Sequence, residues 1–349
     1  MPEGQEKQPL LGRVVRVDAK VVHVDVPDPI ASFAAAQAEA KGSDGEEAEL
    51  PVVETVLAAL RGTLFEDLDG KKNPISVGDL VRVDRTDESV SVEEVLPRRN
   101  YLGRVASSHD PREQVLVANV DQLFMVGSLK NPGFSSNRTD RILAACRWHE
   151  IPATLIFNKA DLDKKGALMD KYRKTYAGIP DLGILVTSTV DGRGIEDLTA
   201  QLKGKVSVLY GPSGAGKSSL LNAIQPGLNI KEGKISSYWK QGKHTTTYSR
   251  LHRMDLGGYV VDTPGIRVFR PHGLTRSHVR DLFPDFAKFQ ALCEFANCTH
   301  DHEPGCAVSD ASEAGMIPDT RYASYLSLLD EVDPDAAYDP DEEGDLGLV

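Results

Sequence analysis

The stretch Gly211-Pro-Ser-Gly-Ala-Gly-Lys217-Ser218 decides the fold of this chain, and it follows Asn158-Lys159-Ala-Asp161 instead of preceding it. The first run has the form G-x-x-x-x-G-K-S of a phosphate-binding loop, in which glycines let backbone N–H groups approach phosphates. Its lysine reaches the β- and γ-phosphate oxygens, and its serine hydroxyl binds Mg²⁺. An apolar, β-branched run at 206–210 precedes the loop, and a helical stretch at 218–224 follows it. The sequence therefore predicts a nucleotide site on an α/β sheet.

The second run selects the base. The carboxylate of Asp161 can accept hydrogen bonds from N1–H and N2–H₂ of guanine, a pair of donors that adenine does not offer. Together the two runs predict GTP as the nucleotide. In an ordinary GTPase the phosphate loop comes first, whereas this chain supplies the guanine motif, then the phosphate loop. The order predicts a circularly permuted GTPase domain.

The elements that would hold Mg²⁺ and the γ-phosphate follow the phosphate loop. Asp262-Thr-Pro-Gly265 has the form D-x-x-G, in which the aspartate holds Mg²⁺ through water and the glycine N–H contacts the γ-phosphate. The polar segment 242–247 lies between the two motifs, offers hydroxyls, and is the expected first switch. Three consecutive threonines leave open which of them binds the ion. The predicted Mg²⁺ ligands are Ser218, Asp262 and either Thr245 or Thr246.

These motifs in this order resemble the RsgA/YjeQ-type circularly permuted GTPases, which act on the small ribosomal subunit. The resemblance extends from about residue 11 to about residue 330. It includes the run 118–122, which opens the GTPase domain, and Thr187-Ser188-Thr189 with Gly192-x-Gly194 as the second guanine-contacting loop. It implies an α/β P-loop GTPase domain between an N-terminal OB-type β-barrel and a C-terminal zinc-binding α-helical module. The predicted GTP-binding residues are Asn158, Lys159, Asp161, Ser188, Thr189, Gly211, Pro212, Ser213, Gly214, Ala215, Gly216, Lys217, Ser218, Ser219, Asp262 and Gly265.

The same resemblance implies the activity and the partners. We expect a monomeric GTP hydrolase that binds the small (30S) ribosomal subunit and its rRNA late in assembly. The subunit would stimulate hydrolysis, and the protein would leave in the GDP form. The second switch, which starts at Asp262, is followed within about thirty residues by the zinc-binding module. Ordering of Gly265 by the γ-phosphate would therefore reposition this module.

The barrel is predicted from short β-like runs between residues 11 and 100. These runs are 12–17, 21–26, 54–64 and 79–83, and five or so short strands with turns between them suggest a small barrel. The pattern alone does not separate an OB-fold from an SH3-like barrel. Basic side chains in this region make an RNA-facing surface plausible: Arg13, Arg16, Lys20, Arg61, Lys71, Lys72, Arg82, Arg98 and Arg99. The predicted organisation is a tail at 1–10, the barrel at 11–100 with an acidic insertion at about 28–50, the GTPase domain at 101–272, the zinc module at 273–330 and an acidic, disordered tail at 331–349.

The net charge of -12 is opposite in sign to the charge that favours RNA binding, but two segments account for it. Residues 330–349 hold nine acidic residues and no basic one, and residues 38–54 hold six acidic residues and one lysine. Without these charges of -9 and -5, the rest of the chain carries +2. Both segments have the composition of solvated or disordered chain, and the preferred interpretation is that they only confer solubility; the alternative is that they limit non-specific RNA binding. No apolar run approaches the ~18 residues of a membrane span, so a soluble, cytoplasmic protein without membrane contact is expected.

Cys293-x4-Cys298-x-His300-x5-Cys306 has the spacing of the zinc module in the family that the chain resembles and not that of a standard zinc finger, so the resemblance is the main ground for predicting a metal site here. Three thiolates and one imidazole can fill all four positions of a tetrahedral Zn²⁺, which indicates one structural ion per chain. The alternatives are three buried core cysteines, or His302 as the imidazole ligand; His300 is preferred because it matches the position in the family that the chain resembles. Flanking stretches at 277–292 and 319–329 have helical apolar spacing. Cys146 stands alone and is expected in the core.

One expected catalytic part is missing. The residue after the D-x-x-G glycine is a glutamine in Ras-like enzymes and orients the attacking water, but here it is Ile266. His244 in the first switch is the predicted replacement, and the alternative is that it only stabilises the loop. Lys217 would neutralise charge on the β/γ oxygens.

Three other classes of protein share some of these features with a ribosome-assembly GTPase. A P-loop kinase or ATPase would share the phosphate loop but has no need of Asn158-Lys-Ala-Asp161. A non-catalytic RNA-binding scaffold would keep its function without Lys217. An elongation-type GTPase would carry its motifs in the usual order.

Overall fold

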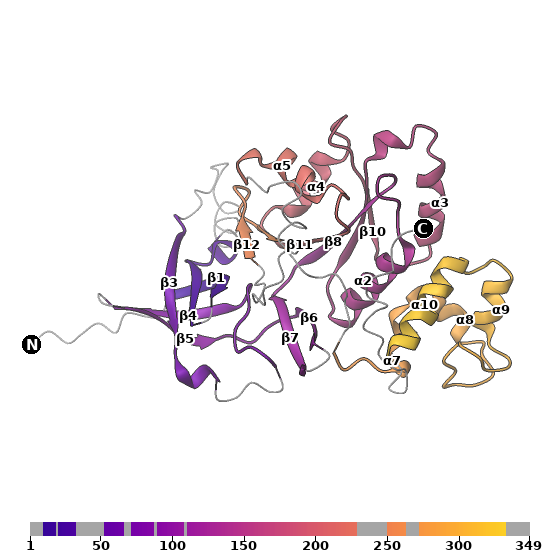
Figure 1. The fold of residues 1–349 in the computed structure, drawn as a ribbon, viewed down its shortest axis with the longest axis horizontal. Coiled ribbons are helices and arrows are strands. Elements are labelled where there is room, and N and C mark those ends of the chain that lie inside the picture. The colour runs from indigo at the N-terminus through magenta and orange to yellow at the C-terminus, as the bar shows by residue number, and fades with distance from the viewer. Residues whose placement is uncertain are drawn as a thin grey trace, which may run out of the picture.

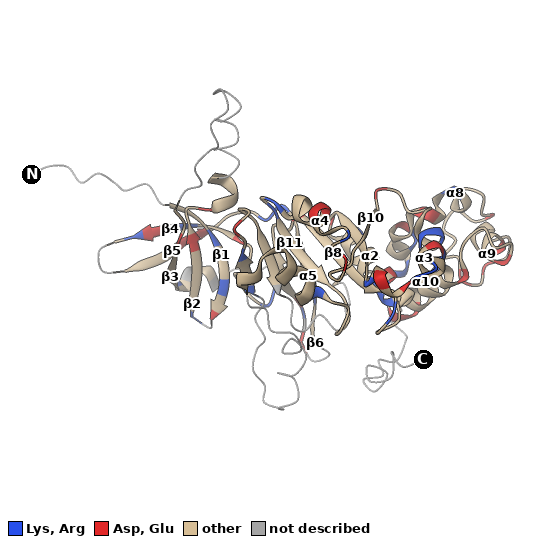
Figure 2. Ribbon diagram, turned by 90° about the horizontal axis from the view of Figure 1, so that it is seen from above, with Lys and Arg blue, Asp and Glu red and all other residues tan. Residues whose placement is uncertain are grey.

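The computed structural model describes residues 10–18, 20–32, 52–65, 71–86, 89–107, 110–228, 250–262 and 272–332. These residues form three parts in a row: a β-barrel, a central sheet covered by helices, and a helical module (Figures 1 and 2). Among them, no helix is both long and apolar enough to cross a membrane.

The barrel is built from five strands, β1 (Leu10–Asp18), β2 (Val21–Val26), β3 (Glu54–Leu60), β4 (Leu80–Arg85) and β5 (Val90–Val95). They pair in the order β1-β2-β3-β5-β4, and pairing of β1 with β4 closes the barrel. Strand β3 runs parallel to β5, and the other neighbours are antiparallel. Valines at alternate positions, among them Val22, Val24, Val81 and Val83, fill the interior. This is the strand order of an OB-fold, so the OB prediction is confirmed over the SH3-like alternative.

One barrel strand is shorter than predicted. The β-like run at 54–64 forms a strand only as far as Leu60, and Gly62–Phe65 turns into a 3-10 helix, η1. A glycine in a strand offers no side chain for packing and raises the entropic cost of the extended conformation, so the strand ends before Gly62.

The central sheet carries the order β10-β9-β8-β11-β13-β12. Its parallel strands are β8 (Gln122–Ser128), β9 (Ala153–Asn158), β10 (Gly183–Val186), β11 (Val206–Tyr210) and β13 (Tyr259–Asp262), and the antiparallel β12 (Arg250–Arg253) lies beyond β13. Strands β8 and β11 are buried along their whole length, as expected when helices cover both faces.

Successive side chains of the strands point to opposite faces of the sheet, so the domain has one core on each face. Leu123 and Met125 pack with the helices α2 (Ser136–Trp148) and α3 (Ala167–Tyr176). Phe124 and Val126 pack with the helices α4 (Ile195–Leu202) and α5 (Lys217–Ile224). The solitary Cys146 is buried in the first of these cores, as predicted. Short 3-10 helices follow β9 (η2, Ala160–Leu162) and α5 (η3, Pro226–Leu228).

The barrel and the central sheet are continuous, which the sequence did not predict. Strand β12 pairs antiparallel with β1 through Arg250 and Arg16, and this joins both parts into one 11-stranded sheet. A separate hairpin of β6 (Tyr101–Ser107) and β7 (Asp110–Ala118) lies between them in sequence.

The C-terminal module is helical, with its own core around Phe283, Phe286 and Tyr325. Its elements are α7 (Arg276–Val279), η5 (Arg280–Leu282), η6 (Pro284–Phe286), α8 (Ala287–Gln290), α9 (Ala307–Glu313) and α10 (Asp319–Glu331). The helical prediction for 319–329 is confirmed by α10. The prediction of one helical stretch over 277–292 is wrong, because Pro284 cannot continue a helix and restricts the residue before it.

This module packs against α2 of the central domain through a buried arginine. Arg321 of α10 forms ion pairs with Asp285 of its own module at 2.6 Å and with Asp140 of α2 at 2.8 Å. A second ion pair joins Arg141 of α2 to Glu331 at the end of α10.

Candidate nucleotide site and metal centre

The phosphate loop is a tight turn between β11 and α5, and its glycines are required by geometry. Gly211, Gly214 and Gly216 have φ values of +156°, +78° and +97°. A Cβ added at Gly211 would lie 2.2 Å from the carbonyl oxygen of Val126. A Cβ at Gly216 would lie 2.2 Å from Nδ2 of Asn158. The loop therefore approaches its neighbours as closely as only glycine permits.

The lysine of the loop folds over the turn. The Nζ atom of Lys217 donates to the carbonyl oxygens of Gly211 at 2.6 Å and Pro212 at 3.0 Å. The ammonium group is thus held across the loop whose backbone N–H groups would receive phosphates. Ser218, the next residue, is buried at the start of α5, and Ala215 is buried beneath the turn. The other predicted residues of this turn and helix start are Ser213 and Ser219.

Asn158 connects the guanine motif to the phosphate loop. It is the last residue of β9 and is 2 % exposed. Its Nδ2 donates to the carbonyl oxygen of Ala215 at 2.8 Å, and its Oδ1 accepts from the Thr187 hydroxyl at 2.9 Å. Lys159 follows with a left-handed backbone, φ +57°, and its Nζ donates to the carbonyl oxygen of Asn131. One amide side chain therefore joins three segments that are up to 57 residues apart.

Asp161 is held by the loop after β10. The hydroxyl of Ser188 donates to Asp161 Oδ1 at 2.7 Å, and the same hydroxyl accepts from the backbone N–H of Val190 at 3.2 Å. Ser188 is fully buried, whereas the next residue, Thr189, is exposed. The structure thus brings the two predicted guanine-contacting segments together. Thr187 lies in the guanine-contacting loop that the resemblance implies, but it was not among the predicted GTP-binding residues, and its hydrogen bond to Asn158 gives it a part in this arrangement.

The magnesium and switch predictions fall mostly outside the described residues. Strand β13 lies parallel to β11 with Val261 opposite Val208, so its last residue, Asp262, reaches the sheet edge at which β11 enters the phosphate loop. Ligands of open α/β sheets bind at this edge, the carboxyl ends of the strands. The residues His244, Thr245, Thr246, Gly265 and Ile266 lie outside the described part of the chain.

The four predicted metal ligands come together in the C-terminal module. One donor atom from each of Cys293, Cys298, His300 and Cys306 lies within 4.8 Å of all the others. The Nδ1 atom of His300 is 3.6 Å from Cys293 Sγ and 3.5 Å from Cys306 Sγ. The competing His302 has a side chain that is 80 % exposed and contacts Asp301 instead.

Local structure explains why His300 takes this place. Its backbone is left-handed, φ +61°, in the segment between Cys298 and Cys306. The Tyr322 hydroxyl donates to its carbonyl oxygen at 2.8 Å and fixes the turn to α10. Burial and the neighbouring thiols raise the pKa of Cys298 to about 12. A divalent cation would favour the thiolate forms of the three cysteines and balance their negative charge. Three sulfurs and one imidazole nitrogen therefore fit a metal such as Zn²⁺.

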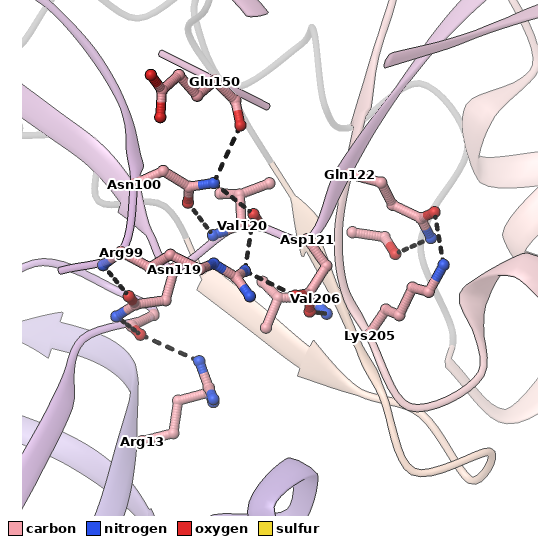
Figure 3. A network of polar contacts seen from close by, with 12 residues as sticks. Arg13, Arg99, Asn100, Asn119, Val120, Asp121, Gln122, Glu150, Lys205 and Val206 are labelled. Carbon is pink, nitrogen blue, oxygen red and sulfur yellow. Dashed lines mark hydrogen bonds and ion pairs between the residues drawn. The ribbon is translucent and has the colours of Figure 1, made fainter. Parts of the chain in front are cut away.

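A polar network connects the barrel to the strand that leads into the phosphate loop (Figure 3). Asn119 accepts from the backbone N–H of Arg99 at 2.9 Å and donates to the carbonyl oxygen of Gly78 in the barrel at 3.1 Å. Arg99 binds Asp121 at 2.7 Å, and Asp121 in turn accepts from the N–H of Val206, the first residue of β11, at 2.8 Å. The predicted run 118–122 therefore forms a joint between barrel and sheet.

Strand order, phosphate loop and guanine motif define the class: this is a circularly permuted P-loop GTPase, a GTP-hydrolysing enzyme with an OB-type barrel at one end and a Cys₃His cluster at the other. The chain belongs to the RsgA GTPase family, whose model matches residues 95–271.

Relatives and solved structures agree with this assignment. "Small ribosomal subunit biogenesis GTPase RsgA 2" of Bacteroides thetaiotaomicron is 38 % identical over 266 residues, which is 74 % of this chain and 84 % of that protein. The RsgA of Moorella thermoacetica is 41 % identical over 69 % of this chain and 79 % of its own. The crystal structure of YjeQ from Thermotoga maritima matches 93 % of this chain and 98 % of its own with a TM-score of 0.65 and 33 % identity. YloQ, a circularly permuted GTPase, shares the fold at a TM-score of 0.65 and 24 % identity, over 95 % of this chain and 98 % of its own.

Proposed function

We propose that this GTPase binds the small ribosomal subunit and assists its late maturation, that the subunit stimulates hydrolysis, and that the GDP form leaves. The relatives are named for biogenesis of the small ribosomal subunit, and they align with this chain over most of both lengths. This supports the small subunit as partner. The observation that carries the nucleotide half is the contact of Asn158 with Ala215, because it places the guanine motif directly against the phosphate loop. A cytoplasmic, monomeric protein would suit this role.

The residues of the phosphate site would act as follows. Lys217 would exchange its two backbone carbonyl partners for β- and γ-phosphate oxygens, and the N–H groups of the turn would bind the same phosphates. Ser218, Asp262 and either Thr245 or Thr246 would hold Mg²⁺, directly or through water. When bound, the ion neutralises charge that develops on the transferred phosphoryl group.

The attacking water needs a polar group. Ile266, at the position of the Ras glutamine, cannot orient water, because an alkyl side chain neither donates nor accepts a hydrogen bond. We assign that task to His244, whose imidazole can do both. Closure of the loop that carries it would complete the site.

The Cys₃His cluster would hold one structural Zn²⁺. All four ligands come from the protein, which leaves no open position for a substrate. The metal would stabilise the turn that carries His300 against α10, and α10 packs on α2, a helix of the nucleotide-binding domain. γ-Phosphate-dependent ordering of Gly265 would then be transmitted to this module.

The RNA-contacting surface is proposed at the seam between barrel and central sheet. Acidic and basic residues alternate over the strands of the barrel (Figure 2). Most of its basic residues are already in ion pairs: Arg13 with Asp28, Arg16 with Asp18, Arg61 with Glu93, Lys72 with Asp110, Arg82 with Glu94, Arg98 with Asp79 and Arg99 with Asp121. A surface formed by the barrel alone therefore presents little unpaired positive charge.

At the seam a further arginine adds to the positive charge. Arg250 lies directly opposite Arg16 across two antiparallel strands, and Asp18, which contacts both Arg16 and His23, offsets only part of this charge. Two arginines in directly opposed positions repel each other, and an anion bound between them would relieve this repulsion. Both arginines line a polar groove of about 330 Å³ together with Arg253. RNA phosphates carry the charge to bind there.

Co-sedimentation with purified small subunits tests the proposal. We expect wild-type protein to sediment with the subunits in the presence of a non-hydrolysable GTP analogue and to remain in the supernatant with GDP. The double variant Arg16→Gln/Arg250→Gln should bind more weakly and with a smaller dependence on salt. Arg82→Gln, which removes an exposed arginine paired with Glu94 on the barrel, is the matched control. Equal sedimentation with both nucleotides would contradict the proposed cycle.

A further inference from the structure

A buried carboxylate of the barrel contacts the nucleotide-binding sheet. Asp25 on β2 is 2 % exposed, and Tyr259, the first residue of β13, is fully buried. The Tyr259 hydroxyl donates to Asp25 Oδ2 at 2.8 Å, although the two residues are 234 positions apart. The Thr55 hydroxyl of β3 donates to the other oxygen, Oδ1, at 2.6 Å. One carboxylate thus ties two barrel strands to a strand of the GTPase sheet.

The surroundings fix the roles of donor and acceptor. Burial, and then the charge of Asp25, raise the pKa of Tyr259, so its hydroxyl keeps its proton and donates. The guanidinium of Arg253 on β12 lies 3.8 Å from Asp25 Oδ2 and also donates to the carbonyl oxygen of Val53 at 3.1 Å. Arg253 thus adds a third contact between the Asp25 carboxylate and the strands around it.

Strand β13 is short, so this contact lies close to the nucleotide site. Tyr259 is opposite Val206 on β11, and Asp262 follows Tyr259 by three residues at the sheet edge where the phosphate loop begins. In a strand of four residues, fixing the first residue fixes the position of the last along the strand axis. Because side chains alternate between the two faces, a slip of one residue would turn Asp262 to the opposite face.

We propose that Asp25 and Tyr259 are positioning residues for the nucleotide site, and that the barrel thereby holds β13 where Asp262 can serve Mg²⁺. This inference rests on the role assigned to Asp262 under the proposed function. It makes the barrel part of the GTPase site: any partner that moves β2 changes the affinity for Mg²⁺ and nucleotide, and nucleotide in turn changes the affinity of the barrel for that partner.

Release of a fluorescent GDP analogue from the full-length protein, measured in Mg²⁺ and in EDTA, tests the inference. We expect Tyr259→Phe, which keeps the ring and removes the hydroxyl, to release nucleotide about tenfold faster in Mg²⁺, as for loss of one hydrogen bond to a charged group. In EDTA its release should stay within about twofold of wild type. Thr55→Val is the matched control, because it removes the other hydrogen bond of Asp25 without touching β13, and it should resemble wild type in both conditions.

Three further results distinguish the possible failures. Asp262→Asn should lose most of the Mg²⁺ effect; if it does not, the role of Asp262 is wrong and the inference fails with it. If Asp262→Asn behaves as expected while Tyr259→Phe matches wild type, the inference alone is overturned. Faster release by Tyr259→Phe to the same extent in Mg²⁺ and EDTA also overturns it, since a general loss of stability does not depend on the ion. Asp25→Asn, which keeps an acceptor oxygen, should lie between wild type and Tyr259→Phe.

Discussion

The amide nitrogen of Asn158 occupies the space that a side chain on Gly216 would need: a Cβ there would lie 2.2 Å from Nδ2. The same nitrogen donates to Ala215 at 2.8 Å, so guanine motif and phosphate loop are packed without room for a methyl group. In this permuted chain the guanine motif precedes the phosphate loop, and this contact places the two motifs side by side in space despite their order in the sequence.

Gly216→Ala should therefore weaken nucleotide binding by about 10- to 100-fold. The alanine would adopt a left-handed backbone, which costs roughly 1–2 kcal/mol, and would displace Asn158 from its hydrogen bond. Titration with a fluorescent GDP analogue measures the change. Gly227→Ala is the control, because a Cβ at that position meets nothing within 4 Å; equal affinities for the two variants would show that the contact is unimportant.

Asp161→Asn should exchange guanine for xanthine specificity. The carboxylate, held by Ser188 at 2.7 Å, would become an amide that can donate to the 2-oxo group of xanthine. The loss of GTP affinity should be on the order of 2–4 kcal/mol, as when buried polar groups lose their partners. Competition by GTP and xanthosine triphosphate for a fluorescent nucleotide measures both effects, and unchanged GTP affinity would refute the assignment.

Cys298→Ala should remove the metal. We expect about one Zn²⁺ per wild-type chain and none in the variant, with looser packing of α8 and α9 and nearly unchanged GTP binding. Elemental analysis of protein purified without chelator gives the metal content. Cys146→Ala is the control: this cysteine is buried in the core of the central domain, so its loss lowers stability and leaves the zinc in place. Wild-type protein without zinc would contradict the proposal.

Arg321→Met should destabilise the chain by about 3–5 kcal/mol, because it leaves Asp140 and Asp285 buried without their cation. Burial already raises the pKa of Asp140 above its ordinary value of 3.8, so the folded state holds this proton more tightly than the unfolded state. Stability contributed in this way is lost as pH rises through the raised pKa. Without Arg321 the pKa rises further, and the deficit should be larger at pH 8 than at pH 5. Thermal unfolding at the two pH values measures it, and a deficit independent of pH would rule out the charge of Asp140 as its cause.

The sequence was sufficient for the parts of this fold that depend on local pattern. The runs 206–210 and 319–329 and the Cys₃His spacing became β11, α10 and the metal cluster, because each is defined by residues that are neighbours in the chain. The pairing of Arg16 with Arg250 and the contact of Asp25 with Tyr259 join residues 234 positions apart, and no periodicity signals such pairs. Pro284 shows a different limit, since its local effect overrode a helical pattern that was otherwise regular.

His244→Ala should separate catalysis from binding. GTP affinity should stay within a few-fold of wild type, and subunit-stimulated hydrolysis should fall by roughly 10- to 1,000-fold, as for loss of a positioned polar group. Lys217→Ala should instead weaken binding, because Lys217 would contact phosphate oxygens that are anionic before the reaction begins. A wild-type rate for His244→Ala at saturating GTP and subunits would mean that the subunit supplies the group that orients the water.

Single-turnover hydrolysis of GTP, with and without saturating purified small subunits, shows whether this protein is a GTPase that the small subunit stimulates. We expect slow hydrolysis by the free protein, since Ile266 replaces the glutamine that orients water in Ras-like enzymes. We expect strong acceleration by small subunits, none by large subunits, and no hydrolysis of ATP under either condition. Equal rates with and without small subunits, or hydrolysis of ATP as fast as GTP, would contradict the proposed function.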